Sequence, residues 1–167
     1  CKTKLMSKNT DFPAPFRRYT DIVRSEWIDY NGHMNVGFYL LVFEEAARSF
    51  FRWLDLSKDY RNRTSCGFFV SECHMTFERE VSEGQHLNFE TQLLDITEKV
   101  VRVIHLMHSI DTPYLAATNE VLYVHVNLDK RASAPIPKEK MLLLDELFMA
   151  HKHLPRPQQV GQSINVR

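Results

Sequence analysis

The chain has 167 residues, a length that suits a single domain with one hydrophobic core. Its 21 basic and 21 acidic residues give a formal net charge of +0, which argues against a nucleic-acid binder because such proteins normally carry a basic face. No apolar run reaches the length of a membrane span, so no membrane partner is expected. The three cysteines form no Cys-x-x-Cys pair, and free thiols predict a reducing, cytoplasmic location.

The composition predicts one folded domain with a short extension at each end. Residues 1–15 are polar and contain Pro13 and Pro15, so they are expected to form an N-terminal arm. Residues 156–167 are expected to form a C-terminal tail. The domain itself is predicted to span residues 16–155.

The domain is expected to begin with a strand over residues 16–28. Asp29 to Met34 follows as a turn, because its Asn-Gly pair favours chain reversal. A helix is then predicted from about residue 36 to 54, with Asn35 as its N-cap. The first half of this helix is apolar on nearly every side, which predicts that it is buried.

Four longer strands and a second helix are predicted after this first helix. Residues 55–67 form a polar connection. The alternation of apolar and polar residues predicts strands over 69–78, 86–95, 99–109 and 114–128. Short turns between them indicate antiparallel pairing, and a C-terminal helix is expected over about 138–151. A lone buried helix needs a cover, so the chain is predicted to be an α+β domain whose curled antiparallel sheet wraps the long helix.

The segment from Trp27 to Asn35 reads Trp-Ile-Asp-Tyr-Asn-Gly-His-Met-Asn and joins a carboxylate to the start of the long helix. The first backbone N–H groups of a helix lack partners within it and carry partial positive charge, which favours developing negative charge. The helix start at Val36 and Gly37 is therefore a candidate oxyanion hole. Asp29 is a candidate nucleophile or general base, and the pattern leaves these two roles open.

The order Asp-x-x-Gly-His-x-Asn, followed by an aromatic helix carrying Phe-Glu-Glu-Ala, resembles the 4-hydroxybenzoyl-CoA thioesterase family of hotdog proteins. Within that family, the motif is most similar to the thioesterases of bacterial carnitine breakdown, which hydrolyse betainyl-CoA. The resemblance implies that Asp29 helps to hydrolyse a short polar or cationic acyl-CoA. It implies no cofactor, because the CoA thioester is the substrate. It also implies that subunits join their sheets in a dimer or tetramer and share the active site between them.

The remaining motif residues are expected to support the loop rather than react. An Asp before a turn is often only a capping residue, but the surrounding motif favours catalysis at Asp29. Gly32 is expected to adopt a positive φ. The residues predicted to hold the loop in shape are Asn31, Gly32, His33 and Asn35.

Aromatic residues are predicted to build the acyl pocket. The candidates are Trp27, Tyr30, Phe38, Phe68 and Phe69. If the acyl group is betainyl, its quaternary ammonium would be stabilised by aromatic faces. The alternative is that most of these rings belong to the hydrophobic core.

The histidines are not expected to bind a metal. His105 lies close in sequence to His108, and His151 to His153, but no further ligand stands at zinc-site spacing. The histidines expected on polar strand faces are His74, His86 and His125. Candidate cations for the CoA phosphates are Arg79, Arg102, Lys130 and Arg131, each of which could equally be ordinary solvated surface.

Two other functions remain open from the sequence. The first is a non-catalytic acyl-CoA-binding protein, which would bind the thioester without releasing thiol. The second is a hotdog hydratase or dehydratase, whose His-Asp or His-Glu arrangement this motif does not supply clearly. No Gly-x-Ser-x-Gly, Gly-x-Gly-x-x-Gly or P-loop motif is present, so serine-hydrolase, dinucleotide-binding and kinase functions lack support.

Overall fold

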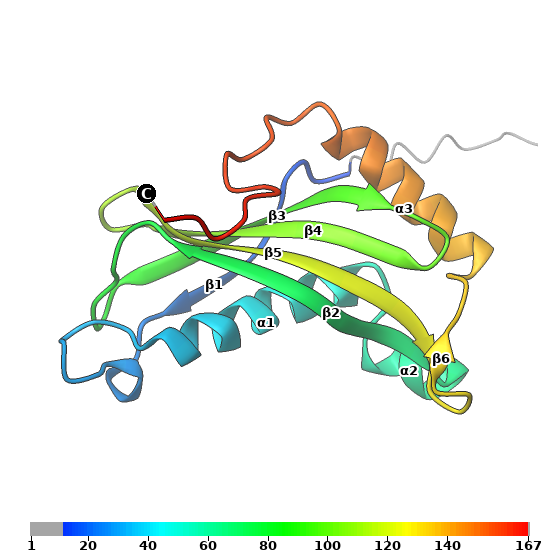
Figure 1. The fold of residues 1–167 in the computed structure, drawn as a ribbon, viewed down its shortest axis with the longest axis horizontal. Helices are drawn as coiled ribbons and strands as arrows, with labels where there is room; N and C mark the ends of the chain where they lie inside the picture. The colour runs from blue at the N-terminus through cyan, green and yellow to red at the C-terminus, as the bar shows by residue number, and fades with distance from the viewer. Residues whose placement is uncertain (1–11, 167) are drawn as a thin grey trace, which may run out of the picture.

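The computed structural model describes residues 12–166, and the prediction for residues 1–11 of the arm lies outside them. In chain order the elements are β1 (Phe16–Ile22), the 3-10 turn η1 (Ser25–Trp27), α1 (Val36–Trp53), α2 (Lys58–Thr64), β2 (Cys66–Phe77), β3 (His86–Ile96), β4 (Val100–Ser109), β5 (Tyr114–Asn127), β6 (Ala132–Ser133) and α3 (Lys138–His151). The predicted α+β arrangement of a long helix wrapped by an antiparallel sheet is confirmed (Figure 1).

The strands form one antiparallel sheet in the order β1, β3, β4, β5 and β2, with the short β6 pairing β5. The register shifts within each of the longer pairings, for example between Val70 and Glu72 and between Leu93 and Asp95. Such bulges bend strands and increase their twist, so they help the sheet to curl around α1. Strand β2 lies at the edge of the sheet and pairs only β5.

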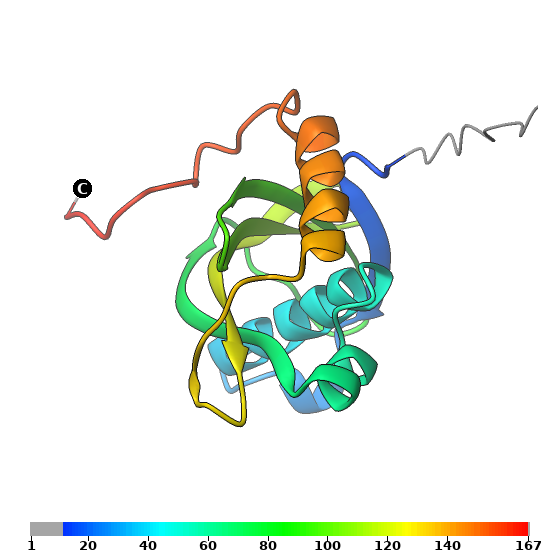
Figure 2. The ribbon, with the colours of Figure 1, turned by 90° about the vertical axis from the view of Figure 1, so that its right-hand side faces the viewer.

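Helix α1 lies along the concave face of the curled sheet, and α3 packs at one end of the same core, where Leu144 and Leu147 join a cluster with Phe50 of α1 and its C-cap residue Leu54 (Figures 1 and 2). The buried residues of α1 recur at helical spacing and form one face against the sheet: Tyr39, Val42, Phe43, Ala46, Ala47, Phe50 and Phe51. On its other side, Val36, Leu40 and Leu41 are 58%, 40% and 47% exposed. The sheet of a single chain therefore buries only part of this apolar helix.

Three local predictions are wrong. The first strand stops at Ile22, and η1 then carries the chain to the turn, so the strand expected over residues 16–28 is too long. The predicted connection over residues 55–67 contains α2, which the polar composition concealed because Tyr60 is its single buried residue. His125 is 1% exposed rather than on a polar face, because it joins α2 to the chain after β6. Its ring nitrogens lie 2.8 Å from the Tyr60 hydroxyl and 2.8 Å from the Ala134 carbonyl oxygen.

The C-terminal part of the chain is attached to the sheet by side-chain and backbone hydrogen bonds. His151 at the end of α3 accepts a hydrogen bond from the Leu93 N–H at 2.8 Å, and its Nε2 lies 2.7 Å from the Pro13 carbonyl oxygen. Beyond α3, the Gly161 N–H donates to Glu120 at 2.7 Å, and the Gln159 amide donates to Glu78 at 3.0 Å. Among the residues described, no helix is long and apolar enough to cross a membrane.

Candidate functional site

The turn before α1 is held by backbone hydrogen bonds within itself and to the sheet. The Asp29 N–H donates to the His33 carbonyl at 3.1 Å, and the Gly32 N–H donates to the Asp29 carbonyl at 3.0 Å. Gly32 has a φ of +81°, as the Asn-Gly pair predicts. The Met34 N–H donates to Val81 at 2.9 Å and so anchors the turn to the chain that follows β2.

The side chain of Asp29 is half-buried and oriented by its own turn. Its Oδ1 accepts a hydrogen bond from the Asn31 N–H at 2.8 Å, the capping contact expected of an Asp in this position. Its Oδ2 makes no hydrogen bond with the residues described. One carboxylate oxygen is therefore fixed while the other is left for a ligand.

The start of α1 supplies one free backbone donor rather than the two predicted. The Asn35 side chain caps the helix by accepting the Gly37 N–H at 3.0 Å. That hydrogen bond occupies the Gly37 donor. The Val36 N–H has no acceptor within residues 12–166, and helix termini commonly leave such groups to ligands.

Asp29 and the start of α1 face a common hollow of about 370 Å³. It is lined by Asp29, His33, Met34, Asn35, Val36, Tyr39, Phe77, Glu78, Arg79 and Glu80. The loop predicted to support Asp29 therefore contributes His33 and Asn35 to the lining. The His33 Nε2 also lies 3.7 Å from the Glu80 carboxylate. The far wall comes from the end of β2 and the residues after it, which the sequence analysis did not include.

Three of the predicted acyl-pocket aromatics do not line this hollow. Trp27 is 3% exposed and stacks on Phe38, with ring centroids 5.9 Å apart. The guanidinium of Arg24 lies 4.8 Å from the Trp27 ring centroid. Tyr30 is 97% exposed at the tip of the turn. Trp27 and Phe38 are therefore packed as part of the core, which was the alternative left open for these rings.

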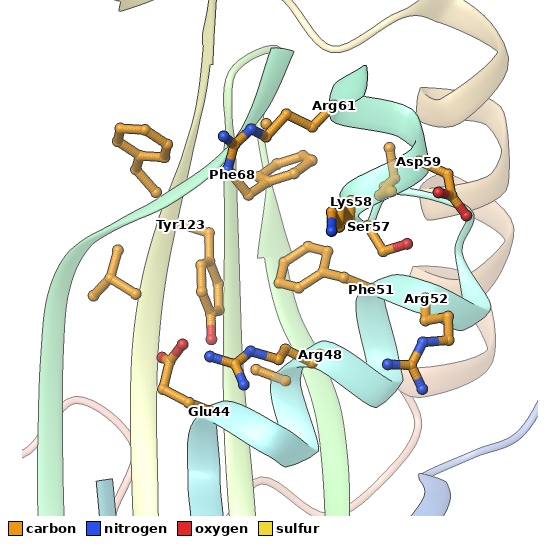
Figure 3. Close-up of a pocket in the computed structure, with 15 residues that line it drawn as sticks. Glu44, Arg48, Phe51, Arg52, Ser57, Lys58, Asp59, Arg61, Phe68 and Tyr123 are labelled. Carbon is orange, nitrogen blue, oxygen red and sulfur yellow. The ribbon is translucent and has the colours of Figure 1, made fainter. Parts of the chain in front are cut away.

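The other two predicted aromatics, Phe68 and Phe69, line a larger hollow of about 870 Å³ toward the C-terminal end of α1 (Figure 3). Its residues come from the successive elements α1, α2 and β2, with the loop between the two helices, and from the more distant strand β5. They are Glu44, Ala47, Arg48, Phe51, Arg52, Leu56, Ser57, Lys58, Asp59, Arg61, Gly67, Phe68, Phe69, Val70 and Tyr123. This hollow was not predicted because α2 was not predicted. A Ser-x-Asp start at Ser57, followed by Tyr60, could have indicated that short helix.

The candidate cations for the CoA phosphates differ in their location and in whether they are already paired. Arg102 is already paired, since it lies 3.1 Å from Asp95 and donates to Glu120 at 2.6 Å. Arg79 lines the Asp29 hollow and lies over the Tyr114 ring. Lys130 and Arg131 are exposed in the turn between β5 and β6, away from both hollows. In the larger hollow, the cations without an ion pair to any described residue are Arg52, Lys58 and Arg61.

The buried histidines have structural partners. His105 is fully buried, with Nδ1 2.8 Å from the Thr91 hydroxyl, and burial lowers its pKa to about 3. Burial also lowers the pKa of His108 and of His151. Within the described part of the chain, no group of three or more His, Cys, Asp or Glu side chains is arranged to hold a metal ion.

Comparisons with known proteins assign the chain to a family. A sequence model described as the thioesterase-like superfamily matches residues 23–147. The betainyl-CoA thioesterase of Pseudomonas aeruginosa is 35% identical over 148 residues, which cover 89% of this chain and 93% of that protein. The L-carnitine dehydrogenase/betainyl-CoA thioesterase of Rhizobium meliloti is 28% identical over 95% of this chain, which spans 32% of that longer protein.

A solved structure agrees with the sequence matches. A Staphylococcus aureus protein determined in complex with CoA superposes with a TM-score of 0.87 at 26% identity, over 95% of this chain and 99% of that one. The predicted resemblance to the hotdog thioesterases is thereby confirmed at the level of family and fold. The chain belongs to the thioesterase-like superfamily.

Proposed function

We propose that the chain is an acyl-CoA thioesterase in which Asp29 acts on a thioester carbonyl held at the start of α1. The observation that supports it is the shared hollow: the free Oδ2 of Asp29 and the unpaired N–H of Val36 both belong to residues that line it. A carbonyl oxygen hydrogen-bonded to Val36 would develop its negative charge at the positive end of a helix of 18 residues.

The proposed reaction is a hydrolysis in which water is the only reactant besides the thioester. Asp29 either attacks the carbonyl carbon or removes a proton from a water that attacks it. The carbonyl oxygen gains negative charge, which the Val36 N–H stabilises. The C–S bond breaks as the carbonyl re-forms, and CoA leaves as a thiol after taking up a proton. If Asp29 is the nucleophile, the single water enters afterwards and hydrolyses the mixed anhydride, which restores the carboxylate and releases the acid.

The proposed substrate is betainyl-CoA or a closely related short cationic acyl-CoA. The support is the 35% identity to the Pseudomonas aeruginosa betainyl-CoA thioesterase, which extends over nearly the whole of both chains. For the CoA phosphates, the unpaired cations Arg52, Lys58 and Arg61 are better candidates than Arg102, whose charge is already matched.

We further propose that two copies join through β2, with dimers as the basic unit. This strand is 12 residues long and pairs on one side only, so its other edge offers unpaired backbone groups. Phe69, Val70 and Phe77 on β2 are 50%, 46% and 50% exposed, and Leu40 and Leu41 lie exposed on α1. A second copy paired antiparallel along β2 would satisfy the edge and cover these apolar side chains.

Thiol release from a panel of acyl-CoAs tests the proposal. We expect wild-type protein to hydrolyse betainyl-CoA, and Asp29→Asn to lower kcat at least about 100-fold, in line with the loss of an acid–base or nucleophilic group. Asp145→Asn, an exposed aspartate on α3, makes the same change of charge elsewhere and should keep the wild-type rate. An Asp29→Asn protein with near-normal kcat would remove Asp29 from the mechanism.

The same assay distinguishes the two other functions. Tight binding of betainyl-CoA without thiol release by the wild type would indicate a binding protein. Hydration of an enoyl-CoA would indicate a hydratase. Single turnover in oxygen-18 water then tests for a nucleophilic Asp29, because label enters its carboxylate only when water opens an anhydride at that carbon, whereas a general base leaves the label in the released acid.

A further inference from the structure

The larger hollow contains an aromatic cluster at its inner wall. The rings of Phe51 and Phe68 are stacked with centroids 5.0 Å apart and planes at 23°. The Tyr123 ring meets Phe51 edge-on, with centroids 4.9 Å apart. These residues come from α1, β2 and β5, so the cluster is fixed by the fold rather than by a loop. Glu44, two turns earlier on α1, lies at the same wall.

Two polar groups at this wall lack partners. The Tyr123 side chain is 4% exposed, yet its hydroxyl makes no hydrogen bond. Glu44 is half-buried and forms neither an ion pair nor a hydrogen bond with the residues described. In Figure 3 the Tyr123 hydroxyl points toward the part of the wall that holds the Glu44 carboxylate and the Arg48 guanidinium. Burial raises the pKa of the Tyr123 phenol, and the negative charge of Glu44 raises it further. Unpartnered buried polar groups require an explanation, and a missing ligand is one.

The chemistry of this wall favours a cation that has no N–H groups. Aromatic faces, a phenol oxygen and a carboxylate are all electron-rich, and each attracts positive charge without requiring a hydrogen-bond donor. A trimethylammonium group spreads its charge over methyl groups and matches such a surface. An ammonium with three N–H donors would instead need several acceptors at fixed angles.

The cations of the same hollow do not neutralise Glu44. Arg48, one turn further along α1, pairs with Glu45 instead. Arg52 lies two turns from Glu44, about 12 Å along the helix axis, and the α2 cations Lys58 and Arg61 follow beyond the end of α1. Arg48 also lines this wall, but its charge is matched by Glu45, so Glu44 is the unpaired charge there among the residues described, whereas the α2 end carries Lys58 and Arg61 together with Asp59.

We infer that Glu44, with the rings of Phe51, Phe68 and Tyr123, selects acyl groups that carry a quaternary ammonium. This inference rests on the proposed function and on pairing through β2. Antiparallel pairing centred on the middle of β2 would bring Phe77 of one copy, which lines the Asp29 hollow, close to the start of β2 near Phe68 in the other copy. The Glu44 wall of one subunit would then complete the Asp29 hollow of the other.

The test compares two substrates that differ only in charge. Betainyl-CoA carries a trimethylammonium group, and 3,3-dimethylbutyryl-CoA carries a neutral tert-butyl group of the same shape. We expect wild type to prefer betainyl-CoA in kcat/KM. Glu44→Gln should lower this preference about tenfold, the size expected for loss of a charge and cation–π contact of this kind, and leave the rate with the neutral ester within about twofold.

Two further variants serve as controls. Glu44→Asp keeps the charge and should retain most of the preference, which a purely structural role for Glu44 would not predict. Glu146→Gln removes an exposed carboxylate from α3 and should change neither rate. The rate with the neutral ester also reports whether each variant is folded.

The outcomes separate this inference from the function that it rests on. If Glu44→Gln hydrolyses both esters with the wild-type preference, the inference is overturned while the thioesterase stands. If wild type releases thiol from neither ester, the proposed function itself fails for short acyl-CoAs. A loss of activity toward both esters in Glu44→Gln, with the fold intact by circular dichroism, would also overturn the charge-selective role.

Discussion

The fully buried His105 predicts a specific loss of stability in acid. Its ring packs beside Phe43, with centroids 6.4 Å apart, and its Nδ1 meets the Thr91 hydroxyl at 2.8 Å. Burial lowers its pKa from the ordinary 6.5 to about 3. Between these values the unfolded chain binds a proton that the folded chain does not. The contribution of His105 is therefore complete above pH 6.5 and declines as the pH falls toward 3.

If His105 is replaced with Leu, the free energies of unfolding of wild type and variant, plotted against pH, are expected to cross. At pH 7 the variant leaves the buried Thr91 hydroxyl without its partner, which costs about 1–3 kcal/mol. Below pH 6.5 the wild type loses about 1.4 kcal/mol per pH unit through His105, and the variant is spared this loss. The variant should therefore become the more stable protein somewhere between about pH 5.8 and 4.4.

Urea unfolding of both proteins at half-unit steps from pH 7 to 4 gives the two curves. His108 and His151 are present in both, so their own acid sensitivity cancels in the difference. His153→Leu removes an exposed histidine and should follow the wild-type curve at every pH. If the wild-type and His105→Leu curves stay parallel down to pH 4, the argument from burial is refuted.

Three further predictions concern the turn, the helix cap and the free edge. Gly32→Ala forces a side chain into a φ of +81°, so it should cost about 1 kcal/mol in urea unfolding, and an unchanged unfolding midpoint would contradict the strain. Asn35→Ala removes the acceptor of the Gly37 N–H and should cost about 1 kcal/mol, whereas Asn35→Asp keeps an acceptor and should cost little. Val70→Arg places a charge on the open edge of β2 and should reduce the mass measured by light scattering to that of one chain. An unchanged mass would show that β2 is not the contact.

The long helix could be predicted well because several local signals agree. Asn35 is a good cap and makes the expected contact, and the apolar residues that follow recur at helical spacing. The short helix α2 carried only the weak Ser-x-Asp signal at Ser57. One buried residue, Tyr60, gives no periodicity, and its partner His125 lies 65 residues further along the chain.

The candidate site, like the fold, could be predicted only where it depends on local sequence. The approach of Asp29 to the start of α1 depends on a turn of a few residues, which the Asn-Gly pair already indicates. Which aromatic residues line each hollow depends on long-range packing, and proximity in sequence does not predict that packing. Tyr30 is adjacent to Asp29 yet points into solvent, whereas Phe77 lines the same hollow from β2.

The attachment of the tail has a practical consequence. The Gln159 amide holds the Glu78 carboxylate, and Glu78 is one of the residues around Asp29. Shortening the chain after residue 155 would remove one of the two donors to this carboxylate among the residues described and leave only the Thr76 hydroxyl, which would loosen a negative charge close to where the thioester is proposed to bind. Truncated or C-terminally tagged protein should therefore be compared with the full-length chain before its rate constants are assigned to the enzyme.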